Sequence, residues 1–92
     1  LLDVPAQAGD TIAAFSRADG VVEWAYYLLK EARSKKMNVA EETRQVDKYA
    51  RILREAKIRW HQFDLKSSRV DADEVFVRVT EIKDTLWKRL PG

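Results

Sequence analysis

Cysteine is absent from this chain, and histidine occurs once, at His61. Without cysteine the protein cannot form disulfide bonds, thiolate metal sites or a catalytic thiol, and the absence is consistent with a reducing compartment. Glycine stands only at positions 9, 20 and 92, so no glycine-rich loop is available to cradle a phosphate or a dinucleotide. No apolar run approaches the roughly 20 residues that span a bilayer, and no signal-peptide pattern is present. We expect no cofactor, no metal ion and no membrane partner, and an intracellular location, nuclear or cytoplasmic.

A large excess of either sign of charge is also missing. The 92 residues include 17 Lys and Arg against 15 Asp and Glu, which leaves a formal net charge of +2. Bulk electrostatics therefore support a nucleic-acid partner only weakly. With 46% hydrophobic and 35% charged residues, the composition indicates a single folded domain over residues 1–92. Because the first residue is Leu rather than Met, we expect a domain excised from a larger protein, which is more often an adaptor than an enzyme.

Helical periodicity is the dominant pattern of the chain. The longest amphipathic stretch runs from Asn38 to about Leu65 without Gly or Pro. Its apolar residues alternate at steps of three and four, which is typical of a helix packed along its length against others. The members of this seam are Val46, Tyr49, Leu53, Ala56, Trp60 and Phe63. The same periodicity predicts main helices over residues 21–36, 39–66 and 72–90.

The first part of the chain carries a weaker pattern. Asp19-Gly20 is expected to interrupt it, so that residues 1–19 are loosely ordered or form a short N-terminal helix. Ile12 and Phe15 are large apolar residues of this segment. If they fold back, they cover the end of the long helix at Trp60; if they do not, an apolar patch is left there for docking.

Capping patterns predict where the other helices begin. Asn38 with Glu41, and Asp71 with Glu74, have the spacing of a capping box, in which each side chain bonds the other residue's backbone N–H. A break is expected before the last helix, at residues 66–69. Short connections make neighbouring helices antiparallel. We therefore predict an all-α fold, an antiparallel three-helix bundle with a long central helix and a possible short N-terminal helix.

Candidate catalytic groups are few. His61 and Asp64 share one side of a helix at three-residue spacing, the minimum geometry of a general base with its orienting carboxylate, but no nucleophile or second ligand accompanies them. The acidic run 71–74 resembles the start of a calcium loop, yet Phe76 and Ile82 stand where such a loop needs Gly and Glu. We expect no catalytic residue and no metal site, and hence no enzymatic activity.

Basic residues form two groups. One lies along the long helix opposite its seam, where a nucleic-acid backbone could follow it; the other gathers at one end of the bundle, where it could hold a phosphate or an acidic peptide. The first group includes Arg44, Lys48, Arg51, Arg59 and Lys66, and the second consists of Arg33, Lys35, Lys36, Lys88 and Arg89. Nucleic-acid binding through these residues is the alternative function, although such charged faces usually only keep a surface soluble.

Aromatic residues exceed what one seam can bury. Tyr26 and Tyr27 are neighbours, so on a helix they point about 100° apart and cannot both be central to one core face. Trp87 is related to Leu86 in the same way, and Ile58 falls on the side of the long helix away from its seam. Trp, Tyr and Arg dominate the binding energy of interfaces. The candidate partner-binding residues are Trp24, Tyr27, Ile58, Trp60 and Trp87.

These features favour a non-catalytic protein–protein interaction module. Its partner would be a helix or a short apolar motif that enters a groove between two helices, and the basic end would favour an acidic partner. Homo-association through an uncovered part of the long helix is a third possibility. No motif in the sequence identifies the partner or the compartment. The bundle fold does not identify them either, because a fold alone does not determine function.

Overall fold

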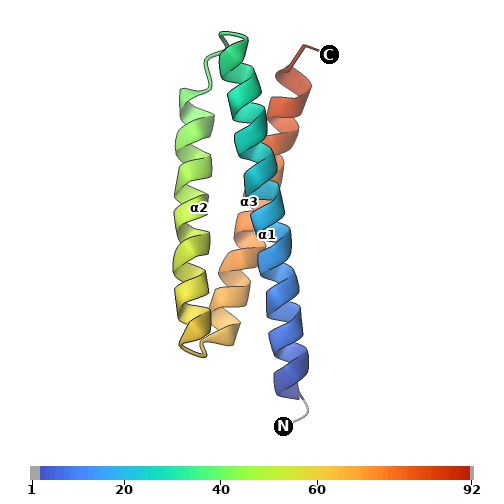
Figure 1. Ribbon diagram of the computed structural model, residues 1–92, viewed down its shortest axis with the longest axis vertical. Coiled ribbons are helices and arrows are strands. Elements are labelled where there is room, and N and C mark those ends of the chain that lie inside the picture. The colour runs from blue at the N-terminus through green and yellow to red at the C-terminus, as the bar shows by residue number, and fades with distance from the viewer. Residues whose placement is uncertain (1–2, 92) are drawn as a thin grey trace.

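The computed structural model describes residues 3–91, with side chains from residue 9 onward. It contains three helices joined by short turns: α1 (Asp3–Ser34), α2 (Ala40–His61) and α3 (Leu65–Arg89). Each helix runs antiparallel to the next along the chain, so α1 and α3 point the same way and α2 runs in the opposite sense (Figure 1). The prediction of an all-α, antiparallel three-helix bundle is confirmed.

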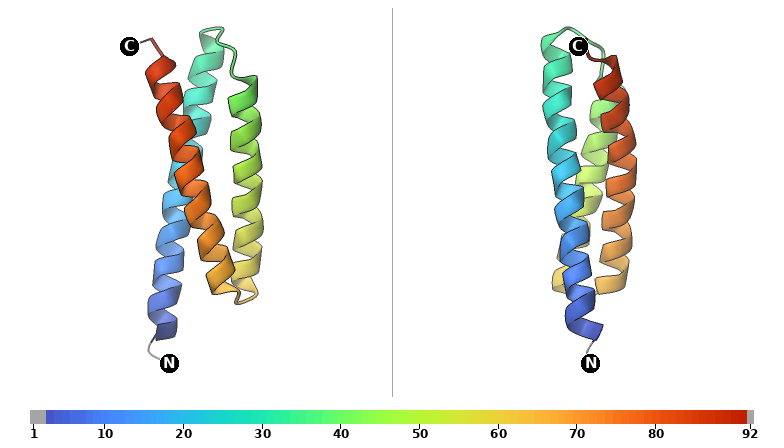
Figure 2. Two further views of the ribbon diagram at one scale, coloured as in Figure 1. Left: turned by 180° about the vertical axis from the view of Figure 1, so that it is seen from behind. Right: turned by 90° about the vertical axis from the view of Figure 1, so that its right-hand side faces the viewer.

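The largest share of the buried apolar core comes from α1. This helix contacts α3 more extensively than α2, and Figure 2 shows α3 lying across α1 when the molecule is seen from behind. Ala18, Ala25 and Ala32 recur every seven residues on α1 and are fully buried, so their small side chains let a neighbouring helix approach closely. The largest fully buried apolar side chains are Leu28, Leu29, Val46, Val75, Val79 and Leu86.

The interruption expected at Asp19-Gly20 is not found, because α1 continues through both residues. A glycine inside a helix costs about 1 kcal/mol relative to alanine. Val21 and Val22 beside it are both buried, and burying one such side chain contributes about 1.5 kcal/mol or more, which outweighs that cost. Residues 3–19 are therefore the first part of α1 rather than a separate short helix, and residues 1 and 2 lie outside the described chain.

The central helix is shorter than predicted. With 22 residues, α2 is the shortest of the three helices and ends at His61 instead of continuing to residue 66. Phe63 adopts a left-handed backbone with φ of 65° and ends the helix. Its N–H donates to the carbonyl of Trp60 (2.9 Å), and the N–H of Asp64 donates to the carbonyl of Arg59 (3.0 Å), the bonding pattern of a Schellman cap. Phe63 is consequently 89% exposed, and its assignment to the seam is wrong.

The third helix begins earlier than predicted, at Leu65. Asp64 is its cap: the carboxylate Oδ1 accepts a hydrogen bond from the N–H of Ser67 at 3.2 Å. Residues 66–69, the expected break, are therefore in the first turns of α3. Asp71 lies inside the helix and pairs with Arg59 of α2.

The start of α2 also differs from the predicted capping box. Val39 is the residue before the helix, and no side chain caps it. Asn38 lies one position further out, where its Oδ1 accepts from the N–H of Ala40 at 3.3 Å. Glu41 pairs with Arg44 of the next turn instead of reaching back to the cap.

The Trp60 end of α2 is covered by α1. The rings of Phe15 and Trp60 lie 5.8 Å apart between centroids, and Phe15 is only 6% exposed. Ile12 is 54% exposed. Of the two residues that could have covered Trp60, Phe15 therefore does so, whereas Ile12 is largely exposed to solvent.

We expect Phe63→Gly to raise the free energy of unfolding by about 1 kcal/mol, because glycine adopts the left-handed backbone without the steric cost of a side chain. The exposed ring of Phe63 contributes little to offset this gain. Urea unfolding of Phe63→Gly and of the matched Phe63→Ala variant measures the difference. Alanine retains the backbone cost, so an equal gain in both variants would contradict strain at this position.

Candidate functional site

Trp24, Tyr27 and Trp87 meet on the outside of the bundle, where α1 and α3 lie together. The rings of Trp24 and Tyr27 are stacked with centroids 5.8 Å apart, and those of Trp24 and Trp87 are 6.4 Å apart. The three side chains are 46%, 54% and 61% exposed, respectively. We call these three residues the aromatic surface. The structure thus brings together three of the five predicted partner-binding residues.

The core forces these aromatic side chains outward. Ala25 and Leu28 of α1 and Leu86 of α3 are buried to 1% exposure or less. Trp24 and Tyr27 lie outside the buried stripe of α1, and Trp87 lies outside the buried stripe of α3, so all three side chains face away from the core. The positions of the aromatic residues therefore follow from helix geometry once the core is packed.

Hollows of similar size flank the aromatic surface. Toward the C-terminal end of α1 lies a hollow of about 410 Å³, lined by Tyr27, Leu28, Glu31, Lys35, Trp87, Leu90 and Pro91. On the other side lies a hollow of about 400 Å³, lined by Ser16, Arg17, Gly20, Val21, Trp24, Phe76, Thr80 and Lys83. The hydroxyl of Thr80 is buried and has no hydrogen-bond partner within the described chain. Exposed aromatic rings between concave regions are typical of a surface that receives apolar side chains.

The other two predicted partner-binding residues are elsewhere. Trp60 is half-buried against Phe15 and borders a separate hollow of about 620 Å³ between α1 and α2. Ile58 is 54% exposed on α2 and lines none of these hollows. The sequence did not single out Gly20 as a lining residue, although a glycine inside a helix was the available signal.

The second predicted group of basic residues lies at one end of the bundle, where part of it is engaged in contacts within the chain. The C-terminal ends of α1 and α3 lie at the same end of the bundle (Figure 1). The guanidinium of Arg89 donates to Glu42 at 2.6 Å and to the carbonyl of Asn38 at 3.2 Å, and that of Arg33 donates to Thr43 at 3.3 Å. Lys35, Lys36 and Lys88 are exposed there.

The predicted basic stripe on α2 is not continuous. Arg44 pairs with Glu41, and Arg59 turns to Asp71 of α3. The ammonium group of Lys48 lies 5.4 Å from the centre of the Tyr49 ring, and Arg51 is exposed. Lys66 belongs to α3.

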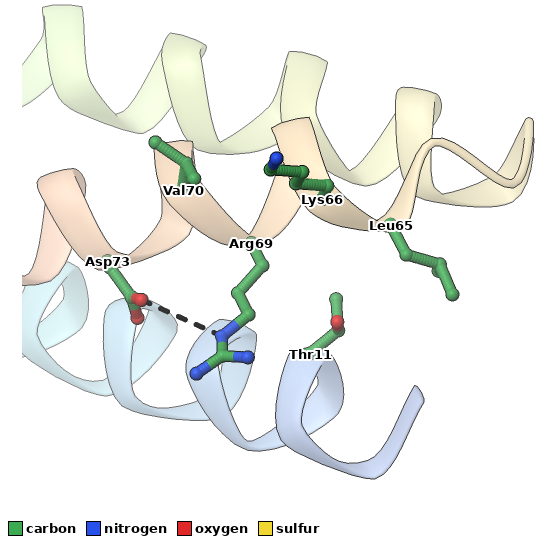
Figure 3. Close-up of a pocket in the computed structure, with 6 residues that line it drawn as sticks. All are labelled: Thr11, Leu65, Lys66, Arg69, Val70 and Asp73. Atoms are coloured by element: carbon green, nitrogen blue, oxygen red, sulfur yellow. Dashed lines mark ion pairs between the residues drawn. The ribbon is translucent and has the colours of Figure 1, made fainter. Parts of the chain in front are cut away.

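A further hollow, of about 450 Å³, lies between the start of α3 and the early part of α1. It is lined by Thr11, Leu65, Lys66, Arg69, Val70 and Asp73 (Figure 3). Arg69 reaches from α3 toward α1 across this hollow. Its guanidinium lies 3.9 Å from Asp73 and 3.8 Å from Asp10, so its charge is shared between two carboxylates rather than presented to an anion.

Tyr26 does not join the aromatic surface, because its hydroxyl donates to the Asp47 carboxylate of α2 at 2.5 Å. Burial, followed by this hydrogen bond and the negative charge of Asp47, raises the pKa of Tyr26 to about 12, while Arg54 opposes the shift. Of the two adjacent tyrosines, Tyr26 thus links α1 to α2 and Tyr27 faces solvent.

His61 and Asp64, the acid–base pair considered from the sequence, take different roles in the structure. His61 is exposed with its ring 5.3 Å from that of Trp60, and Asp64 caps α3 instead of orienting the imidazole. Among the residues described, no group of three His, Asp or Glu side chains could hold a metal ion. No helix in residues 3–91 is long and apolar enough to cross a membrane. Comparisons with protein-family models, curated proteins and solved structures find no match to this chain.

Tyr26 should ionise about two pH units later than a free tyrosine, whose pKa is near 10. Because the fold favours the neutral phenol, the contribution to stability is complete below pH 10 and is lost as the pH rises through about 12. Subtracting the ultraviolet pH titration of Tyr26→Phe from that of the wild type isolates this group. Asp47→Asn should move the pKa only part of the way back, since burial, the largest single cause, is unchanged.

Truncation should cost much more stability at Leu86 than at Trp87. Leu86→Ala is expected to cost about 3 kcal/mol of stability, because it empties a fully buried site. Trp87→Ala should cost less than about 1 kcal/mol, because most of the indole is already in water. Thermal unfolding of both variants tests the pair. A larger loss for Trp87→Ala would show that its ring is a core residue.

Proposed function

We propose that this chain is a protein-interaction domain that binds an apolar segment of its partner on the aromatic surface. The supporting observation is the contact of three large aromatic side chains across α1 and α3 while about half of each remains in water. Side chains of this type dominate binding energies when a partner covers them. Scattered exposed apolar residues are ordinary, whereas a contiguous aromatic group between hollows needs an explanation.

Covering the aromatic surface would release enough free energy to anchor a partner, but not enough to offset the whole cost of association. Covering the exposed parts of three such rings would remove roughly 300 Å² from water, worth about 8 kcal/mol. Association itself costs on the order of 4–15 kcal/mol in lost freedom of motion. The partner must therefore also contact the rim and the flanking hollows, and one isolated apolar side chain would bind only weakly.

Lysine side chains beside the aromatic surface favour a partner that carries a carboxylate at one end. Lys35 lines the hollow beside Tyr27 and Trp87, and Lys36 and Lys88 lie exposed at the same end of the bundle. Glu31 is the opposing charge in that hollow, so the preference for an acidic partner is secondary to the aromatic contacts. Nucleic-acid binding remains a prediction without a favouring observation, since the stripe on α2 is interrupted by internal ion pairs.

Photo-crosslinking tests this function directly. With p-benzoylphenylalanine at position 27, the protein should form a discrete adduct in extracts of its source cells, and Trp87→Ala in the same chain should abolish that adduct. The matched control carries the crosslinker at position 58, since Ile58 is equally exposed but lies apart from the aromatic surface. Equal adducts from both positions, or an adduct that survives Trp87→Ala in a folded protein, would contradict the proposal.

A further inference from the structure

Gly20 lies inside α1, where glycine is unfavourable compared with alanine. None of the described glycines has a positive φ, so the backbone here does not need glycine. A Cβ built on Gly20 would meet no atom within 4 Å, so packing within the bundle does not need it either. The isolated chain therefore offers no structural reason for the missing side chain.

Gly20 is also the point where hollows on both sides of α1 meet. The hollow toward α2 includes Ile12, Ser16, Gly20 and Trp60 in its lining, and the one toward α3 includes Ser16, Gly20 and Trp24. A smaller hollow, lined by Gly20, Glu23, Trp24 and Tyr27, shares Gly20 with both. We call these three hollows, which all border Gly20, the trough; Trp24 and Tyr27 of the aromatic surface line part of it.

Charges along this trough are largely neutralised within the bundle. The carboxylate of Asp19 lies 2.8 Å from the ammonium of Lys57. Arg17 pairs with Asp73 at 3.7 Å, and Lys83 pairs with Asp84 at 3.2 Å. The floor therefore complements an uncharged apolar face. Glu23 on the rim has no ion pair with any described residue, so a basic residue at the edge of that face would complement it.

We propose that the partner segment is an amphipathic helix that crosses α1 at Gly20, with its apolar face in the trough and on the aromatic surface. This inference rests on the proposed function and adds the conformation of the partner and its point of closest approach. Helix axes pack 8–10 Å apart depending on the side chains at the crossing, and a glycine permits the shorter distance. An added strand is a poor alternative, because residues 3–91 contain no sheet edge for it to join.

Gly20→Leu separates folding from binding. Leucine favours the helix, and its Cβ would meet no neighbouring part of the bundle within 4 Å, so Tm should rise by about 4 °C, whereas affinity for the partner helix should fall about ten-fold or more as the side chain enters the trough. Thr85→Leu is the matched control, because it places leucine at an exposed position on another face of α3 and should leave binding unchanged.

The probes are two phage-displayed libraries sorted on the 92-residue chain, one of short amphipathic helices and one of unstructured or proline-rich peptides of equal length. Helical clones should dominate, lose binding to Gly20→Leu and to Trp24→Ala, and retain binding to Thr85→Leu. Clones that lose binding to Trp24→Ala but tolerate Gly20→Leu, or a predominance of proline-rich clones, would overturn the crossing helix while leaving the proposed function intact. Clones that bind Gly20→Leu and Trp24→Ala as tightly as the unchanged chain would contradict the crossing helix and the proposed function together.

Discussion

Everything on the outside of this bundle depends on which arc of each helix is buried. A helix within three-helix packing turns one stripe to the core, and its side chains are separated by 100° steps. Ala25, Leu28 and Leu86 belong to the buried stripes, whereas Trp24, Tyr27 and Trp87 lie outside these stripes and meet on the surface. The aromatic surface is thus a consequence of core packing, which sets where each helix carries its outward-facing residues.

Electrostatics and turn geometry fix how the helices present that surface. Interhelical ion pairs, among them Lys57 with Asp19 and Arg59 with Asp71, hold the side chains of facing helices together and use up charges that would otherwise face a partner. Two Schellman turns, with Lys36 and Phe63 in left-handed conformations, reverse the chain and align α1 parallel to α3. Ion pairs within the bundle therefore account for part of the charged surface, whereas the aromatic surface and the trough are exposed features that the core does not need.

The bundle could be predicted from the sequence because its apolar periodicity is unbroken over each helix. The C-terminal end of α2 and the start of α3 could not be predicted in this way. The residue that ends α2 is Phe63, whose apolar ring fits the seam pattern although its backbone is left-handed. Asp64 and Asp71 both precede suitable helical sequence, and only tertiary packing decides that Asp64 is the cap and Asp71 an ion-pair partner. Trp24, Tyr27 and Trp87 could be chosen from spacing alone, but their mutual contact required the register of α1 against α3. Gly20 was wrongly predicted to break the helix. The low helix propensity of glycine is visible in the sequence, but the burial of Val21 and Val22 that outweighs it is not.

If the proposed function is correct, the aromatic surface is open in the isolated chain and covered in its working complex. Hydroxyl-radical footprinting measures this directly, because solvent-exposed Trp and Tyr side chains are oxidised and covered ones are protected. The structure predicts strong oxidation of Trp24, Tyr27 and Trp87 in the purified chain and selective protection of these three in an extract of its source cells, with exposed Phe63 equally reactive in both. Equal oxidation of the aromatic surface in both samples would contradict the claim.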